Sequence, residues 1–185
     1  MKTVVLLGDS IRMNYEKTVI ARLGVDYDVC APKENCRFSG YTLNSLNRFW
    51  MKDFPKPDVI HWNNGIWDLY YVNQDMGIFT PLDEYLHYIR RVLKELRKTG
   101  AHIIWASTTP VDDGKITCCR NDEIDLYNSA AAEIMRSEGI PINDLNSVVK
   151  ANLDLYLSQE DYLHLSEEGK IACAEAVVKA VKGYI

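Results

Sequence analysis

The stretch TVVLLGDSI, residues 3–11, decides the fold of this 185-residue chain. Its four consecutive apolar residues, 4–7, predict a strand that is buried on both faces, as in a parallel sheet. The apolar run stops at a glycine, a carboxylate and a hydroxyl (residues 8–10), and an amphipathic helical pattern begins at once at Ile11. A buried strand followed directly by a helix indicates the first half of a β–α–β unit.

The rest of the chain continues this alternation of apolar strands and amphipathic helices. Strands are expected at residues 4–7, 25–31, 58–65, 101–107 and 140–145, and helices at 11–23, 41–54, 81–98, 121–139 and 166–182. Such alternation predicts a parallel sheet with helices on both faces, because each parallel connection has to cross back over the sheet. The predicted fold is an α/β, three-layer α/β/α sandwich with a mostly parallel five-stranded sheet, flavodoxin-like, in one domain over residues 1–185.

Helical spacing also predicts which side chains face the core. In the helix expected at 41–54 the apolar stripe is Leu43, Leu46, Phe49 and Trp50. In the last helix it is Ile171, Ala174, Val178 and Val181. The strand at 25–31 alternates apolar and polar residues, which is typical of a half-exposed edge strand. Gly139 is expected to end its helix as a C-terminal cap.

The composition restricts the class of function. A net charge of −5 argues against a nucleic-acid or anionic-membrane partner, since both favour basic faces. The five cysteines are an odd number without a C-x-x-C pair, so neither a disulfide framework nor a zinc site is expected. No apolar run approaches the ~18 residues of a membrane span, and the first one is too short for a signal peptide. We therefore expect a cytoplasmic protein without metal or cofactor, and its oligomeric state stays open.

Residues with chemical function follow several of the predicted strands. Ser10 follows the first strand, Asn63 and Asn64 end the third, and His164 precedes the last helix with Asp161 three residues upstream. In doubly wound folds the carboxyl ends of the strands meet at one edge, where reactive groups gather. A hydroxyl, an imidazole, a carboxylate near it and amide donors are the parts that nucleophilic acyl transfer requires.

Two interpretations of Ser10 are open at this point. A serine at the start of a helix is commonly an N-cap that satisfies free backbone N–H groups. Alternatively, Gly8 permits a sharp turn that lifts the Ser10 hydroxyl above the sheet, next to the amino end of the helix. The second interpretation makes Ser10 a nucleophile and His164 its base.

These residues resemble the SGNH/GDSL hydrolase family. Its first block, commonly Gly-Asp-Ser-Leu, reads here Gly8-Asp9-Ser10-Ile11, and its last block, Asp-x-x-His, reads Asp161-Tyr162-Leu163-His164. Gly40 in CRFSGYT, residues 36–42, corresponds to the glycine of the second block. The blocks and the α/β pattern together cover essentially the whole chain, as in GDSL-type esterases, lipases and acylhydrolases.

The resemblance implies a serine esterase that hydrolyses carboxylic esters of a small-molecule substrate through an acyl-enzyme. It implies that Ser10 attacks the carbonyl carbon, that His164 acts as general base and then acid, and that Asp161 orients His164. The oxyanion would be held by the backbone N–H groups of Ser10 and Gly40 and by the side-chain amide of an asparagine.

The third block departs from the family's usual Gly-x-Asn-Asp. The chain reads Gly65-Ile66-Trp67-Asp68, so Trp67 stands where the asparagine is expected. The form Asn-x-Gly-x-x-Asp, seen in some members, points to Asn63 as the oxyanion donor, with Asn64 as the alternative. The departure keeps a second function open, namely a catalytically impaired SGNH-like protein or a flavodoxin-like small-molecule binding module.

Aromatic residues gather in the segment that follows the third strand. Trp67, Tyr70 and Tyr71 are candidate substrate-binding residues, and they equally fit a long loop anchored to the body of the protein by its aromatic side chains. By analogy with the family, we expect the substrate to carry a short acyl group, such as an acetyl group on a carbohydrate.

Overall fold

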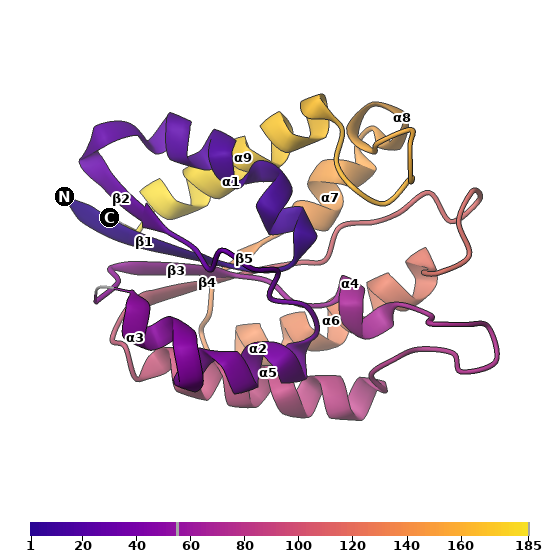
Figure 1. The fold of residues 1–185 in the computed structure, drawn as a ribbon, viewed down its shortest axis with the longest axis horizontal. Helices are drawn as coiled ribbons and strands as arrows, with labels where there is room; N and C mark the ends of the chain where they lie inside the picture. The colour runs from indigo at the N-terminus through magenta and orange to yellow at the C-terminus, as the bar shows by residue number, and fades with distance from the viewer. Residues whose placement is uncertain (55, 185) are drawn as a thin grey trace.

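The strands form a five-stranded sheet with helices on both faces (Figure 1). The computed structural model describes residues 1–54 and 56–184. The strands are β1 (Lys2–Leu7), β2 (Tyr27–Cys30), β3 (Val59–Trp62), β4 (His102–Ala106) and β5 (Ile142–Asn143). Their order is β2-β1-β3-β4-β5, and every neighbouring pair is parallel. The expected α/β/α sandwich is confirmed, and β2 is an edge strand as its alternating pattern predicted.

The helices divide between the two faces of the sheet (Figure 1). They are α1 (Ser10–Leu23), α2 (Ser39–Ser45), α3 (Met51–Asp53), α4 (Ile66–Leu69), α5 (Leu82–Arg97), α6 (Asn121–Ser137), α7 (Leu145–Lys150), α8 (Leu153–Tyr156) and α9 (Glu167–Lys182). Figure 1 shows α1, α7 and α9 on one face and α2, α3, α5 and α6 on the other. Within the described residues, no helix is both long and apolar enough to span a bilayer.

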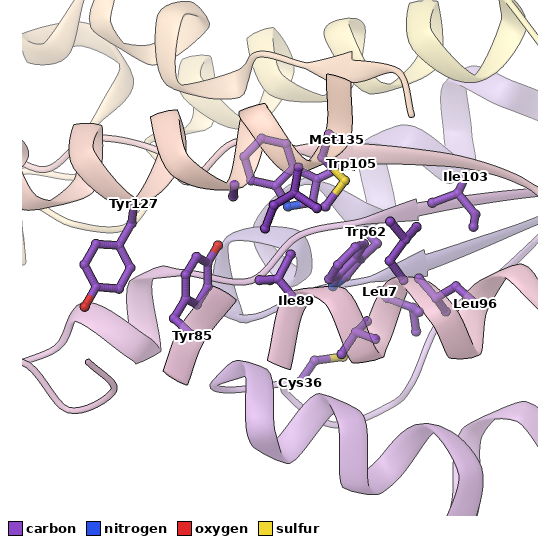
Figure 2. Packing of buried hydrophobic residues seen from close by; sticks show 14 of the residues in the cluster. Leu7, Cys36, Trp62, Tyr85, Ile89, Leu96, Ile103, Trp105, Tyr127 and Met135 are labelled. Carbon is purple, nitrogen blue, oxygen red and sulfur yellow. The ribbon is translucent and has the colours of Figure 1, made fainter. Parts of the chain in front are cut away.

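The first strand contributes side chains to two cores. Val4 and Leu6 lie in the cluster that contains α1 and α9, whereas Val5 and Leu7 lie in the cluster on the opposite face. All four are fully buried, which is why this strand reads as a continuous apolar run. Figure 2 shows Leu7 in one cluster with side chains of β3, β4 and α5.

The helix expected at 41–54 is not regular. A π-helical turn at Leu46–Trp50 separates α2 from α3. Because a π turn contains more residues than an α turn, it rotates the following side chains about the helix axis. Leu46 and Trp50 are buried, but Phe49 is 52 % exposed, so its predicted place in the core is wrong.

The last helix presents a different stripe to the core from the one expected. The buried residues of α9 are Gly169, Cys173, Ala174, Val177 and Val181. Ile171 is 44 % exposed, so its predicted core position is wrong, and Val178 is only partly buried. A close contact between Gly169 and the backbone of Tyr156 sets this rotation, because only a residue without a side chain fits there. α6 ends at Ser137 with Glu138 as its C-cap residue, and Gly139, the next residue, has the positive φ of 66° that commonly terminates a helix.

The contact at Gly169 predicts a position-specific loss of stability. A Cβ atom at Gly169 would lie 2.1 Å from the Tyr156 carbonyl oxygen, whereas at Gly183 the nearest atom would be 3.4 Å away. We expect Gly169→Ala to lower the free energy of unfolding by about 1–3 kcal/mol, because the backbone has to move. Gly183→Ala is the matched control and should change it little. Urea denaturation of both variants measures the difference, and equal stabilities would contradict this packing.

Candidate active site

The turn between β1 and α1 is capped by Asp9 and not by Ser10. The Asp9 Oδ1 atom accepts a hydrogen bond from the Ile11 N–H at 2.9 Å, which makes Asp9 the N-cap of α1. Ser10 is the first residue of the helix and is half-buried. The N-cap interpretation of Ser10 is therefore wrong, and its hydroxyl is available for other partners.

Gly8 is required by a close approach of another chain segment. A Cβ atom at Gly8 would lie 1.9 Å from Asn63 Oδ1 and 2.7 Å from Arg12 Cβ. The Gly8 N–H donates to Cys36 Sγ at 3.3 Å, and the Gly8 carbonyl accepts from the Cys36 N–H at 3.1 Å. Gly8 does not have a positive φ, so close packing explains the glycine here better than the sharp turn expected from the sequence.

Ser10, His164 and Asp161 form a continuous line of polar contacts. The distance from Ser10 Oγ to His164 Nε2 is 2.8 Å. The distance from His164 Nδ1 to Asp161 Oδ2 is 2.6 Å. The structure therefore brings together, across more than 150 positions of sequence, the three residues that the sequence singled out.

A tight turn folds Asp161 back onto His164. The other carboxylate oxygen, Asp161 Oδ1, accepts from the backbone N–H groups of Leu163 at 3.1 Å and His164 at 2.9 Å. Tyr162 adopts a left-handed φ of 57°, which is uncommon for a residue with a large side chain and typical of constrained sites. The sequence spacing Asp-x-x-His thus closes into a ring of hydrogen bonds.

The charge on Asp161 fixes how the hydrogens are arranged. Partial burial acts to raise the pKa of Asp161, but the hydrogen bonds from His164 and Leu163 outweigh it and lower that pKa. An ionised carboxylate only accepts, so His164 Nδ1 carries the hydrogen and donates it. The Nε2 atom is then an acceptor for the Ser10 hydroxyl, as a general base requires.

The two asparagines at the end of β3 lie in different surroundings. The Asn64 amide nitrogen donates to the Arg37 carbonyl at 3.0 Å and to Thr42 Oγ1 at 2.9 Å, and its Oδ1 accepts from Trp62 Nε1 at 2.7 Å. Asn63 is buried against Gly8, and its Oδ1 has no hydrogen-bond partner in residues 1–54 and 56–184. Internal contacts occupy the Asn64 amide, whereas Asn63 lies beside the turn that carries Ser10.

Gly40 is the second residue of α2. The first N–H groups of a helix have no acceptor inside the helix, so the Gly40 amide is left to bind another group. A Cβ atom at this position would lie 3.3 Å from the ring of Tyr88. Neither Gly40 nor Asn63 lines the pocket that contains Ser10.

Ser10 and His164 open into a pocket of about 330 Å³ whose walls are mainly apolar. The lining residues are Ser10, Asn35, Ile66, Trp67, Tyr70, Leu163 and His164. Trp67 and Tyr70 also line a second pocket of about 210 Å³, together with Arg37, Phe38, Val72 and Phe79. Tyr71 lines neither of these two pockets, and its hydroxyl donates to Glu123 of α6.

The sequence did not single out Asn35 or Arg12. Asn35 lines the pocket, and its Oδ1 accepts from the Arg37 N–H at 2.7 Å. Arg12 is only 1 % exposed and donates to the Glu34 carbonyl at 2.8 Å, which fixes the segment beside Asn35. Only the identity of these residues is visible in the sequence, because their roles depend on contacts between segments.

Two buried carboxyl groups border the site. Burial raises the pKa of Asp9 to about 6, although the Ile11 N–H and the Asn63 side chain act against this shift. Burial also raises the pKa of Asp68 to about 7, opposed by Ser39 and Thr80 and reinforced by Asp9. Within the described ranges, no group of three or more His, Cys, Asp or Glu side chains is placed to hold a metal ion.

The buried Asp9 predicts a pH-dependent stability. An acid with a raised folded pKa contributes stability that is fully present below its unfolded value, near 3.8, and is lost as the pH rises through about 6. Asn is an equally good N-cap without the charge. We expect Asp9→Asn to gain stability relative to wild type as the pH rises from 4 to 7, by about 2–3 kcal/mol.

The N-cap of α7, Asp144, provides the matched control for this measurement. Burial acts to raise the pKa of Asp144, but hydrogen bonds from Ser147 and Ser107 lower it overall. Asp144→Asn should therefore change little relative to wild type over the same rise in pH, because the stability that a lowered pKa contributes is present above the unfolded value near 3.8 and is lost only below it. Thermal unfolding at several pH values measures both, and a parallel trend in the two variants would contradict the assignment.

Comparison with known proteins finds solved structures with a similar fold. No protein-family model and no curated protein sequence matches this chain. Among solved structures, a lipase/acylhydrolase from Enterococcus faecalis has a TM-score of 0.82 at 20 % identity, covering 99 % of this chain and 96 % of its own. An acetyl xylan esterase has a TM-score of 0.79 at 16 % identity, with 97 % and 99 % covered. A GDSL-like lipase from Bacteroides thetaiotaomicron has a TM-score of 0.73 at 14 % identity, with 100 % and 89 % covered.

These similarities extend over the whole chain at low sequence identity. Each of the three proteins is matched over nearly its full length, so the likeness is not restricted to a common β–α–β unit. The structural neighbours of this protein are GDSL/SGNH-like lipases, acylhydrolases and esterases, and its five-stranded parallel α/β fold is the one found in SGNH hydrolase structures.

Proposed function

We propose that this protein is a serine esterase that hydrolyses carboxylic esters through an acyl-enzyme on Ser10. The observation that carries the proposal is the line of contacts from Ser10 Oγ through His164 to Asp161, with distances of 2.8 and 2.6 Å, at the wall of a pocket. The fold supports it, because the structural neighbours include lipases, acylhydrolases and esterases.

The reaction begins with attack of Ser10 Oγ on the acyl carbon. His164 Nε2 takes the hydroxyl proton, and the ionised Asp161 stabilises the imidazolium that forms. His164 then returns the proton to the alcohol oxygen as the ester C–O bond breaks, and the acyl group stays on Ser10. A water molecule, activated by His164, attacks this acyl-enzyme and releases the acid.

The negative charge on the carbonyl oxygen requires hydrogen-bond donors. We assign this role to the backbone N–H groups of Ser10 and Gly40 and to the side-chain amide of Asn63. Ser10 and Gly40 lie in the first turns of their helices, where N–H groups lack acceptors inside the helix. Asn63 is preferred to Asn64, because both the amide nitrogen and the oxygen of Asn64 are engaged within the protein.

For the substrate we propose a small-molecule ester with a short acyl group, such as an acetyl group on a carbohydrate. The pocket of about 330 Å³ at Ser10 accommodates an acetyl group together with part of the alcohol. An acetyl xylan esterase among the structural neighbours supports this choice. Trp67 and Tyr70, which line the pocket, provide apolar walls for the substrate.

The first test is turnover of p-nitrophenyl esters. We expect the wild type to hydrolyse the acetate faster than the octanoate and Ser10→Ala to lower kcat by at least about 10³-fold, because the nucleophile is lost. Ser129→Ala, at an exposed position of α6, is the control and should retain full activity. Equal rates in wild type and Ser10→Ala would overturn the proposal, and an inactive wild type would favour an impaired relative or a binding module.

The assignment of Asn63 gives a second kinetic test. We expect Asn63→Ala to lower kcat by about 10²–10³-fold, as loss of one oxyanion donor does in other enzymes. Asn64→Ala should instead lower the free energy of unfolding, because Trp62 Nε1 and the Arg37 carbonyl lose their partner. Steady-state kinetics on folded protein, with urea denaturation alongside, separate the two effects. A larger loss of kcat in Asn64→Ala would reverse the assignment.

A further inference from the structure

The carboxylate of Asp68 holds the amino end of α2. The Ser39 N–H lies 3.1 Å from Asp68 Oδ1 and 3.0 Å from Oδ2, and the Ser39 hydroxyl donates to Oδ1 at 2.6 Å. Both residues are fully buried. The residue that precedes the helix, Phe38, makes no capping hydrogen bond with its side chain. Asp68 thus supplies from another segment the acceptor that an N-cap residue normally provides.

The same residue ties α2 to the segment between β3 and α5. Asp68 belongs to the short helix α4, and its carbonyl accepts from the Thr80 N–H at 2.8 Å. The Thr80 side chain also acts on the Asp68 carboxyl group, whose pKa it lowers. Nearby, the rings of Phe38 and Phe79 lie 5.1 Å apart. The segment 66–80 and the amino end of α2 are therefore joined at two points.

We propose that Asp68 is a positioning residue for ester hydrolysis, which orients the Gly40 N–H toward the oxyanion by fixing Ser39 immediately before it. This inference rests on the proposed function, since it assumes that Gly40 is an oxyanion donor. Asp68 does not touch the substrate in this account. Its hydrogen bonds fix the position of Ser39, and the peptide bond between Ser39 and Gly40 then fixes the direction of the Gly40 N–H.

The ionised form of Asp68 is the one that fits these contacts. Three contacts from Ser39 reach its two oxygens, and an ionised carboxylate accepts all three. A protonated carboxyl group would either reverse the hydrogen bond with the Ser39 hydroxyl or stand as a donor against the Ser39 N–H. Burial raises the pKa of Asp68 to about 7, Ser39 and Thr80 lower it, and Asp9 raises it. The other titratable groups that face it are Tyr85 and Tyr88 of α5 and Tyr127 of α6. Asp68 is therefore expected to gain a proton as the pH falls below about 7.

The test compares Asp68→Asn with the wild type on p-nitrophenyl acetate. The amide nitrogen of the variant would stand as a donor against the Ser39 N–H or reverse the hydrogen bond with the Ser39 hydroxyl, so the amino end of α2 shifts. We expect kcat to fall about 10- to 100-fold with little change in KM, because the oxyanion exists only in the transition state. The fall of kcat at acidic pH should also depend on one proton fewer, because the variant has no carboxyl group to protonate at this position.

Two further variants separate positioning from folding. Asp58→Asn is the matched control, because Asp58 likewise accepts a backbone N–H from another element, that of Thr3 at 2.8 Å, and it lies immediately before β3. Its kcat and pH profile should equal those of the wild type. Ser39→Ala removes only the hydroxyl donor and should lower kcat less than Asp68→Asn does. If Asp68→Asn fails to fold, Ser39→Ala decides the question by the same kcat and KM comparison.

The outcomes distinguish this inference from the proposed function. Loss of activity in Ser10→Ala together with a wild-type kcat and pH profile in Asp68→Asn would overturn the positioning role and leave the esterase intact. A fall in kcat of Asp68→Asn that is matched by an equal rise in KM, with an unchanged pH profile, would also overturn it. Activity that persists in Ser10→Ala would instead overturn the proposed function itself.

Discussion

The close approach of three chain segments at Gly8 is the constraint on which the site depends. Asn63, at the end of β3, packs where a Gly8 side chain would be, and Cys36 exchanges two hydrogen bonds with the Gly8 backbone. The buried Arg12 donates to the carbonyl groups of Gly8 and Glu34, and it so joins the turn at Gly8 to the segment that contains Cys36. As a result, the turn that carries Ser10 is held in a fixed position relative to the end of β3 and to the segment that contains Glu34 and Cys36.

This constraint explains how the short turn at Ser10 can form a site together with His164, which is far away in the sequence. Ser10 is placed by the first turn of α1, whose direction the Asp9 cap and the sheet determine together. His164 reaches it from the far end of the chain, on a turn closed by Asp161. The Leu165 N–H donates to Asn14 of α1 at 3.1 Å, which holds that turn against the helix that begins with Ser10.

The sequence predicted the order and type of the main elements because their apolar patterns are strong. It also predicted the Ser10, His164 and Asp161 cluster, because Ser10 follows a buried strand and the Asp-x-x-His spacing, together with Gly8-Asp9-Ser10, resembles the blocks of SGNH/GDSL hydrolases. It failed where contacts between elements override local pattern, as at the π turn that exposes Phe49 and at the rotation of α9. The contacts of Asp68 with Ser39 were not predictable, because they join residues 29 positions apart in two short helices, α2 and α4.

The role of Ser10 as the nucleophile can be tested by covalent labelling. The wild type would be incubated with a fluorophosphonate probe, digested and mapped by mass spectrometry. We expect one adduct, on Ser10, whose rate of formation falls in His164→Ala because the base is lost. An adduct on another residue, or labelling of Ser10 at an unchanged rate without His164, would contradict it.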